Sequence, residues 1–210
     1  MNKFAPSYNP KIYSQAFVQS SKMNIIRPSK PSDASAMLQI YAPYILNTAF
    51  TFETEVPTVE DFEHRIIACQ ENWPWLVYEV DGVIAGYAYA AKHRERAAYQ
   101  WCVESSIYIA NTFQQKGIGK ALYTALFQIL TFQGCRNVYA GITLPNEKSL
   151  AFHTGFGFTW IADYNNIGYK LGKWNTVSWL QLQLNPYSAD PAIPVKFTNV
   201  DPSLLNVVIS

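Results

Sequence analysis

The sequence predicts a single domain of the mixed α/β or α+β class. Segments rich in β-branched and aromatic residues recur along the chain, and segments with helical apolar spacing lie between them. The composition, with 49% hydrophobic and 15% charged residues, is ordinary for a globular enzyme and unlike a disordered chain. The predicted order is strand, two helices, hairpin, strand, helix, strand, helix, strand. A length of 210 residues allows one well-filled core or two small ones.

The first part of the domain is expected to contain a short strand and two helices. Residues 24–27 can form the strand, and Ser32 or Asp33 is a candidate N-cap for a helix that ends near Tyr44. A second helix is expected over residues 58–71, because a capping threonine is followed by two acidic residues in the first turn.

Strands dominate the middle of the chain. Residues 75–80 and 83–91 have strand character, and the Asp81-Gly82 pair between them is a strong hairpin signal. Residues 101–109 form a third long segment of β-branched and aromatic residues, so we expect another strand there.

The second half is expected to alternate helices and strands. Apolar residues repeat at helical spacing before the natural stop at Gly134, namely Ile118, Leu122, Ala125, Leu126 and Ile129. Further on we expect a strand over 138–143, a helix over 146–155 and a last strand assembled from Tyr169 and residues 174–184.

Both ends of the chain differ from the middle. Residues 1–22 have no clear periodicity and are interpreted as an N-terminal arm, unless Met23 is the natural start. Residues 23–184 form the predicted domain. Four prolines follow Asn185, so residues 185–210 are expected to be an extended tail on the body of the protein or on a neighbour.

Charge and cysteine content exclude several classes of function. A formal net charge of +1 provides no general attraction for nucleic acid or anionic membranes. The three cysteines are widely spaced and form no CxxC pair, so we expect neither disulfides nor a metal site. No apolar run approaches the roughly 18 residues of a membrane span, and no signal peptide core is present. We therefore expect a cytoplasmic protein with reduced thiols.

The most informative segment joins the third strand to the long helix. Gly117 and Gly119 lie where the helix begins, and Lys116 and Lys120 flank them. Glycine lets a ligand approach the backbone, and free amides at a helix start bind anions, so the segment could hold a pyrophosphate. Taken alone, two glycines at a helix start more often mark a tight strand-to-helix turn than a ligand site.

Two motifs resemble the GNAT N-acetyltransferase superfamily. The segment Gln114–Gly119 reads Gln-x-x-Gly-x-Gly, similar to the family loop (Gln/Arg)-x-x-Gly-x-(Gly/Ala) that binds coenzyme A at the start of the central helix. Asn146 and Ser149 then match Asn-x-x-(small)-x-x-x-Tyr, with His153 at the tyrosine position, and Gly-Phe follows at 157–158.

The resemblance extends to the phosphinothricin acetyltransferase-like branch of that superfamily. It covers residues 24–184 and is carried by the segments 51–55, 74–77, 96–99, 104–109, 141–146 and 173–177. It implies a mixed, V-splayed sheet with helices on both faces and typically a homodimer. It also implies acetylation of the α-amine of phosphinothricin, methionine sulfoximine or methionine sulfone.

Acetyl-CoA is the implied co-substrate, with no metal. Its pantetheine arm is expected to pair with the strand residues Ile107, Tyr108 and Ile109, as an added strand would. A backbone amide near Ile109 could stabilise the oxyanion. The remaining expected contacts are Gln114, Gln115, Lys116, Gly117, Ile118, Gly119, Lys120, Asn146 and Ser149.

Two residues are candidates for proton transfer. Glu104 matches the glutamate of the family strand and is expected to accept the ammonium proton, directly or through water. A structural hydrogen bond is the alternative role for Glu104. His153 could donate a proton to the departing thiolate. The alternative is a reaction without a general acid, because a thiolate is a tolerable leaving group.

The resemblance also implies a small-molecule amine site. Arg96 and Tyr99 fall where the branch recognises its amino acid, and Phe52 and Tyr108 could wall the pocket. Two alternatives remain open: the same fold acting on a peptide or protein N-terminus or a polyamine, and a coenzyme A sensor without turnover. His64 and His93 match no motif and receive no predicted role.

Overall fold

The computed structural model describes residues 24–209, with side chains to 205. The N-terminal arm expected over residues 1–22 therefore lies outside the described residues. The helices and strands in chain order are β1 (Asn24–Pro28), α1 (Ala34–Asn47), α2 (Val59–Gln70), β2 (Trp75–Val80), β3 (Val83–Lys92), β4 (Cys102–Ile109), α3 (Ile118–Gln133), β5 (Asn137–Thr143), α4 (Glu147–Gly155), β6 (Thr159–Lys170), β7 (Lys173–Gln183) and α5 (Pro202–Ile209). Short 3-10 helices are η1 (Pro31–Asp33), η2 (Ala97–Tyr99), η3 (Asn111–Phe113) and η4 (Phe197–Asn199).

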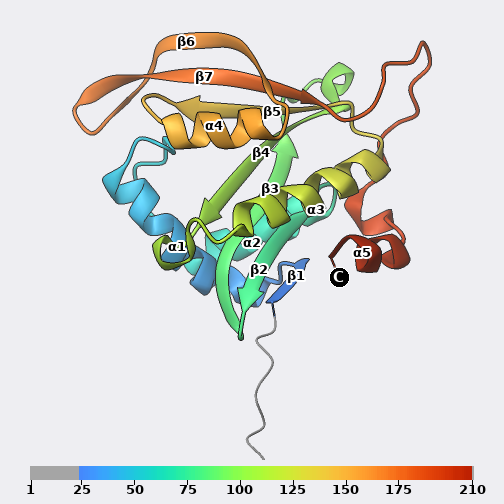
Figure 1. Ribbon diagram of the computed structural model, residues 1–210, viewed down its shortest axis with the longest axis horizontal. Coiled ribbons are helices and arrows are strands. Elements are labelled where there is room, and N and C mark those ends of the chain that lie inside the picture. The colour runs from blue at the N-terminus through green and yellow to red at the C-terminus, as the bar shows by residue number, and fades with distance from the viewer. Residues whose placement is uncertain (1–23, 210) are drawn as a thin grey trace, which may run out of the picture.

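One mixed sheet organises the molecule, as the sequence predicted. Its strands lie in the order β1-β2-β3-β4-β5-β7-β6, and the β4–β5 pair is parallel while the other pairs are antiparallel. In Figure 1, α3 and α4 lie in front of this sheet and α2 lies behind it. Each face has its own core: α3 packs in one hydrophobic cluster, and α1 and α2 pack in the other.

The parallel pair β4–β5 opens into a fork. The two strands pair only at Cys102↔Asn137, Val103↔Val138 and Glu104↔Tyr139, and they diverge beyond Glu104. Beyond this point the edge of β4 pairs with no strand of the described chain, while its other edge stays paired with β3 through Ile109. The splayed sheet that the resemblance implied is therefore present.

Local sequence signals determine several element ends. The Thr58 side chain caps α2 by accepting a hydrogen bond from the Asp61 amide at 3.1 Å. The hairpin turn places Asp81 and Gly82 at φ 51° and 83°, where glycine and aspartate are favoured. Gly134 ends α3 with φ 89°.

The N-cap of α1 differs from the expected geometry. Asp33 does occupy the cap position, but its carboxylate makes no bond to the amides of α1. Instead it accepts hydrogen bonds from the Arg27 guanidinium at 2.7 and 3.0 Å and from the Lys30 amide at 2.7 Å. The ion pair with Arg27, six residues earlier in the chain, takes the place of the cap.

Two expectations near the C-terminus differ from the structure in the elements they named. In place of the single last strand that we expected, the structure has a hairpin of two long strands, β6 and β7. The sequence did not indicate β6, because this strand is exposed on both faces and has no alternation of apolar and polar residues. The tail after Asn185 is not extended throughout, since it contains η4 and α5. Phe197 and Val200 are buried in the core, and α5 lies beside α3 and β1 (Figure 1).

Candidate active site

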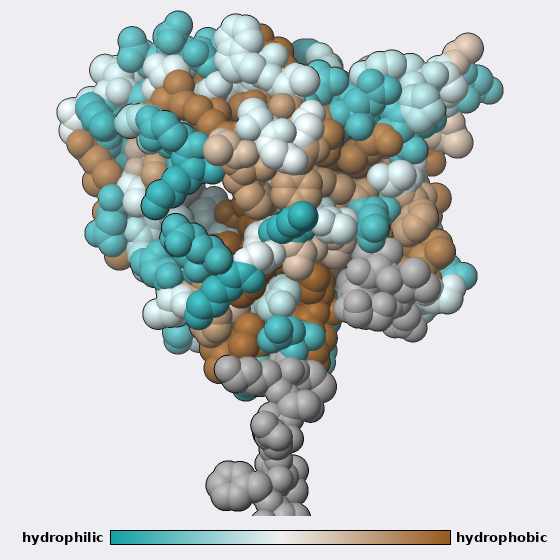
Figure 2. Space-filling model, in the orientation of Figure 1, coloured by the Kyte–Doolittle hydropathy of each residue, from teal (hydrophilic) through white to brown (hydrophobic). Residues whose placement is uncertain are grey.

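A cleft of about 770 Å³ lies where β4 and β5 diverge. Residues 105–109 of β4 form one wall and residues 140–143 of β5 form the other. The start of α3 and the first turns of α4 complete the lining. Figure 2 shows the surface hollowed between α4 and the start of α3. We call this hollow the central cleft.

The loop before α3 has the geometry of an anion site. Gln115 and Gly117 adopt left-handed conformations, with φ 62° and 79°. This conformation turns successive backbone amides toward one side and exposes the first amides of α3, an arrangement that binds anionic oxygens. A Cβ at Gly119 would stand 3.3 Å from the Phe152 ring, so this glycine also allows α3 and α4 to approach each other.

Most of the expected coenzyme contacts lie in the central cleft. They are Ile107, Tyr108, Ile109, Gln114, Gln115, Gly117, Ile118, Gly119, Lys120, Asn146 and Ser149. Lys116 is not part of the lining, because its ammonium lies over the Phe113 ring at 4.9 Å. Asn146 has a structural role as well, since its side-chain oxygen caps α4 by accepting from the Ser149 amide at 3.2 Å.

His153 lies in the cleft wall with both ring nitrogens bonded. Nδ1 is 2.8 Å from the Ser149 carbonyl, and Nε2 is 3.1 Å from the Tyr123 hydroxyl. The Tyr123 hydroxyl is also 3.2 Å from Oγ of Ser105. Burial lowers the pKa of His153 and raises that of Tyr123, so both side chains are neutral near pH 7. A neutral His153 donates from Nδ1 to the carbonyl and accepts from Tyr123 at Nε2.

This arrangement differs from a histidine with a free proton aimed at the thioester. Sequence reasoning also missed Tyr123 and Ser105, which both line the central cleft. Tyr123 stands four residues after Gly119, so the two share one face of α3, but this spacing does not indicate that His153 lies beside Tyr123.

Glu104 marks the point where β4 and β5 separate. It belongs to the last pair of the β4–β5 ladder, and its carboxylate is 36% exposed. Oε1 of Glu104 lies 2.9 Å from Nδ1 of His93, a residue to which the sequence assigned no role. Because side chains alternate along a strand, Glu104 and Ser105 lie on opposite faces of β4. One face of the strand therefore carries the carboxylate and the other the hydroxyl.

Three of the expected substrate residues lie outside the lining of the central cleft. Arg96 and Tyr99 are exposed on η2, where Tyr99 contacts the edge of the His93 ring at 6.3 Å between centroids. Phe52 lies in the α1–α2 loop against Gly168 of β6, so close that a Cβ at Gly168 would overlap its ring. Tyr108 is the substrate candidate that does line the cleft.

A buried lysine connects the same loop to the β6–β7 hairpin. Lys170 is 5% exposed, and its ammonium donates to the Thr51 carbonyl at 2.7 Å. Burial lowers the pKa of Lys170. Together with the Phe52–Gly168 contact, this bond holds the α1–α2 loop against the hairpin.

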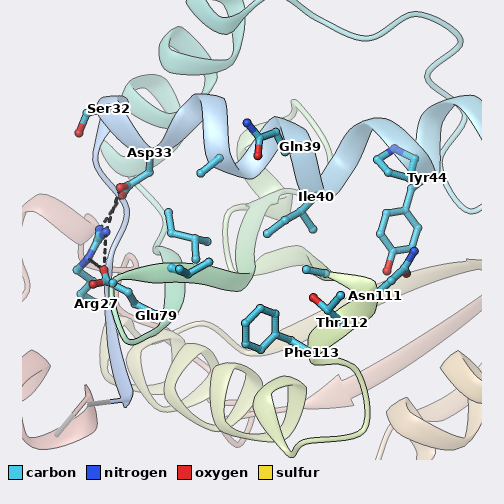
Figure 3. A pocket seen from close by; sticks show the side chains of 16 residues that line it. Arg27, Ser32, Asp33, Gln39, Ile40, Tyr44, Glu79, Asn111, Thr112 and Phe113 are labelled. Carbon is cyan, nitrogen blue, oxygen red and sulfur yellow. Dashed lines mark hydrogen bonds and ion pairs between the residues drawn. The ribbon is translucent and has the colours of Figure 1, made fainter. Parts of the chain in front are cut away.

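A second cavity of about 600 Å³ lies beneath α1, on the other side of Tyr44 (Figure 3). At one end, Arg27 bonds to Asp33 and Glu79, so these charged groups satisfy one another. At the other end, the Tyr44 hydroxyl donates to the Ile109 carbonyl at 2.9 Å. Among the described residues, no cluster of His, Cys, Asp and Glu is suited to hold a metal ion, and no helix is long and apolar enough to cross a bilayer.

The central cleft combines an anion-binding helix start with two splayed strands. The resemblance implied this arrangement for an enzyme that uses an acyl-coenzyme A. Comparison with known proteins agrees. The profile of the GNAT acetyltransferase domain matches residues 26–179. The chain is 37% identical over 171 residues to phosphinothricin N-acetyltransferase of Streptomyces viridochromogenes, covering 81% of this chain and 93% of that protein.

Two further relatives point the same way. The chain is 30% identical to the L-methionine sulfoximine/L-methionine sulfone acetyltransferase of Salmonella typhimurium, covering 80% of this chain and 98% of the relative. The solved structure of a GNAT superfamily phosphinothricin acetyltransferase from Sinorhizobium meliloti, in complex with AcCoA, superposes with a TM-score of 0.77. Their identity is 31%, over 80% of this chain and 93% of that one.

The chain belongs to the GNAT acetyltransferase family. It is an N-acetyltransferase that uses acetyl-CoA as its co-substrate. The central cleft fits this co-substrate, because the left-handed loop at Gly117 offers backbone amides to a pyrophosphate and the unpaired edge of β4 can accept an extended arm.

Proposed function

We propose that this enzyme transfers the acetyl group to the α-amine of a small amino-acid-like substrate of the phosphinothricin, methionine sulfoximine or methionine sulfone type. The names of the two curated relatives support this substrate class. The observation that carries the mechanism is the fork of β4 and β5, with the central cleft along Ser105–Ile109. Glu104 is not part of the cleft lining, but it directly precedes Ser105 and ends the β4–β5 ladder. Amine and thioester can meet there in one ternary complex.

Glu104 is the proposed proton acceptor. The amine must lose a proton before its nitrogen attacks the thioester carbonyl, and a carboxylate at the fork can take that proton directly or through water. Its partial exposure leaves room for such a water. A backbone amide near Ile109 is the proposed donor to the oxyanion.

His153 is proposed to act on the thiolate through Tyr123. The tyrosine hydroxyl borders the cleft between His153 and Ser105, so it can turn its hydrogen from Nε2 toward a departing sulfur. A hydrogen bond to the sulfur stabilises the thiolate without requiring a protonated imidazole.

The substrate would reach Glu104 past the α1–α2 loop. Phe52 and Tyr108 provide apolar surface. Tyr99 of η2 contacts the His93 ring, and Arg96 is the N-cap residue of η2. The exposed guanidinium of Arg96 suits the carboxylate or the phosphinyl or sulfonyl oxygens of the substrate. A polyamine would meet this cation unfavourably, which favours an anionic or zwitterionic amine.

The test is thiol release from acetyl-CoA with phosphinothricin, methionine sulfoximine, methionine sulfone, polyamines and N-terminal peptides. Glu104→Gln is compared with wild type, and Glu95→Gln is the matched control, because Glu95 pairs only with Lys92 at the surface. We expect turnover on the phosphorus and sulfur amino acids, lowered about 100-fold or more by Glu104→Gln alone. Coenzyme A binding without turnover on any amine would instead identify a sensor.

A homodimer and a cytoplasmic location are further parts of the proposal. The β6–β7 hairpin exposes Trp160, Tyr169 and Trp174 by 61–63%, an apolar surface that a second copy could cover. The free thiols of Cys69, Cys102 and Cys135 suit a reducing compartment. Sedimentation of wild type and Trp174→Ser tests the dimer: the substitution is expected to shift the protein toward monomer.

A further inference from the structure

His93 is placed at the carboxylate of Glu104 by the fold. His93 directly follows β3, and the β3–β4 register pairs Ala91 with Glu104. The imidazole therefore lies close to Glu104 on the neighbouring strand β4. Nδ1 of His93 lies 2.9 Å from Oε1 of Glu104, which is hydrogen-bond distance. The other carboxylate oxygen, Oε2, has no hydrogen bond within the described chain.

The ring of His93 is fixed by its neighbours. It stacks on Tyr139 of β5, with centroids 4.4 Å apart and an interplanar angle of 21°. The edges of Trp179 and Tyr99 contact it at 6.0 and 6.3 Å. The side chain is 15% exposed. These contacts restrict rotation of the ring, so Nδ1 stays directed at Glu104.

We propose that His93 is a positioning residue for Glu104: it donates Nδ1–H to Oε1 and thereby presents Oε2, ionised and oriented, to the ammonium group of the substrate. The inference rests on the proposed role of Glu104 as proton acceptor. Because Tyr99 contacts the same ring, His93 also connects the carboxylate to the proposed substrate-recognition residues on η2.

The proton balance of the step is simple. One N–H bond of the ammonium breaks, its proton forms a bond to Oε2, and the electron pair stays on nitrogen. Nitrogen then attacks the carbonyl carbon, and the carbon–sulfur bond breaks with its electrons on sulfur. Nitrogen releases a second proton as the amide forms, and this proton passes to the thiolate sulfur, directly or through water. His93 forms and breaks no covalent bond; its hydrogen bond orients the carboxylate.

Few other groups that titrate face the imidazole. Glu104 approaches from β4, Tyr139 from β5 and Tyr99 from η2, and Trp179 of β7 does not titrate. Burial raises the pKa of Tyr139, so this side chain stays neutral across the assay range. The nearby charges of Lys92 and Glu95 pair with each other at 3.0 Å. Within the described residues, Glu104 is therefore the charged group that bonds to the imidazole.

The test compares His93→Phe, which keeps a ring on Tyr139 without a donor, with His93→Asn, which restores a donor close to the Nδ1 position. Removing a hydrogen bond to a charged group lowers kcat/KM by roughly 10- to 100-fold in His93→Phe. His93→Asn should recover activity several-fold over His93→Phe. The matched control is His64→Phe, on exposed α2 surface.

A double variant separates this role from a structural one. If His93 acts through Glu104, His93→Phe has no further effect on turnover in a Glu104→Gln background, and the KM for acetyl-CoA stays at its wild-type value. An equal loss in both backgrounds would overturn the inference, as would the absence of any recovery in His93→Asn. Full activity of Glu104→Gln would overturn the proposed function as well, whereas a depressed Glu104→Gln beside an unaffected His93→Phe would overturn only the inference.

Discussion

Removing the hydroxyl of Tyr123 is the most discriminating perturbation of the cleft wall. Tyr123→Phe keeps the ring, which packs on Phe127 and Phe152 at centroid distances of 4.6 and 5.3 Å. It deletes the one atom that bonds to both Ser105 and His153. Nε2 of His153 would remain buried without a partner, so the loss of unfolding free energy should be about 1–3 kcal/mol.

Two assays follow this variant. For a chain of this size the melting temperature should fall by roughly 2–4 °C for each kcal/mol lost. In thiol-release kinetics, kcat should fall about 10-fold or more if the hydroxyl stabilises the thiolate, since such a donor acts in the transition state. Tyr164→Phe is the matched control, because the exposed Tyr164 hydroxyl makes no hydrogen bond within the described residues. Equal melting temperatures for the two variants would refute the stability argument, and an unchanged kcat would refute the role in thiolate stabilisation.

Two further predictions concern His153 and Lys170. Burial lowers the pKa of His153 below its ordinary 6.5. The contribution of the neutral imidazole to folding stability is therefore fully present above pH 6.5 and is lost as the pH falls. The melting temperature of His153→Gln should depend less on acid pH than that of the wild type. Lys170→Met removes the bond to the Thr51 carbonyl and releases the α1–α2 loop, so the KM for the amine should rise about 10-fold while the KM for acetyl-CoA stays constant. Lys173→Met, on the exposed surface of the same hairpin, should change neither constant, and a rise in both KM values for Lys170→Met would contradict a local effect.

Most of the fold could be predicted because its signals are local. The α2 cap at Thr58, the Asp81-Gly82 turn and the Gly134 stop each depend on neighbours within a few residues. The α3 pattern was equally clear, because a helix against a sheet must bury one regular face. β6 was not predicted, because a strand exposed on both faces needs no alternation of apolar and polar residues.

The residues of the candidate site also divide into those marked by a local motif and those brought together only by tertiary contacts. The coenzyme loop was recognisable because its function needs glycine at fixed spacing before a helix, and Gly117 does adopt the left-handed conformation. The neighbours of Glu104 and His153 were not recognisable. His93 reaches Glu104 from another strand, and Tyr123 reaches His153 from another helix, thirty residues away.

The sequence by itself determined the class of domain, the place of the coenzyme loop and the family to which the chain belongs, because each depends on residue type at short, regular spacing. Only the tertiary structure decided which polar groups meet: His93 with Glu104, Tyr123 with His153, and Lys170 with Thr51. The physical reason is that strand register and helix packing bring together side chains whose separation along the chain carries no signal. The proton chemistry of the site depends on those contacts.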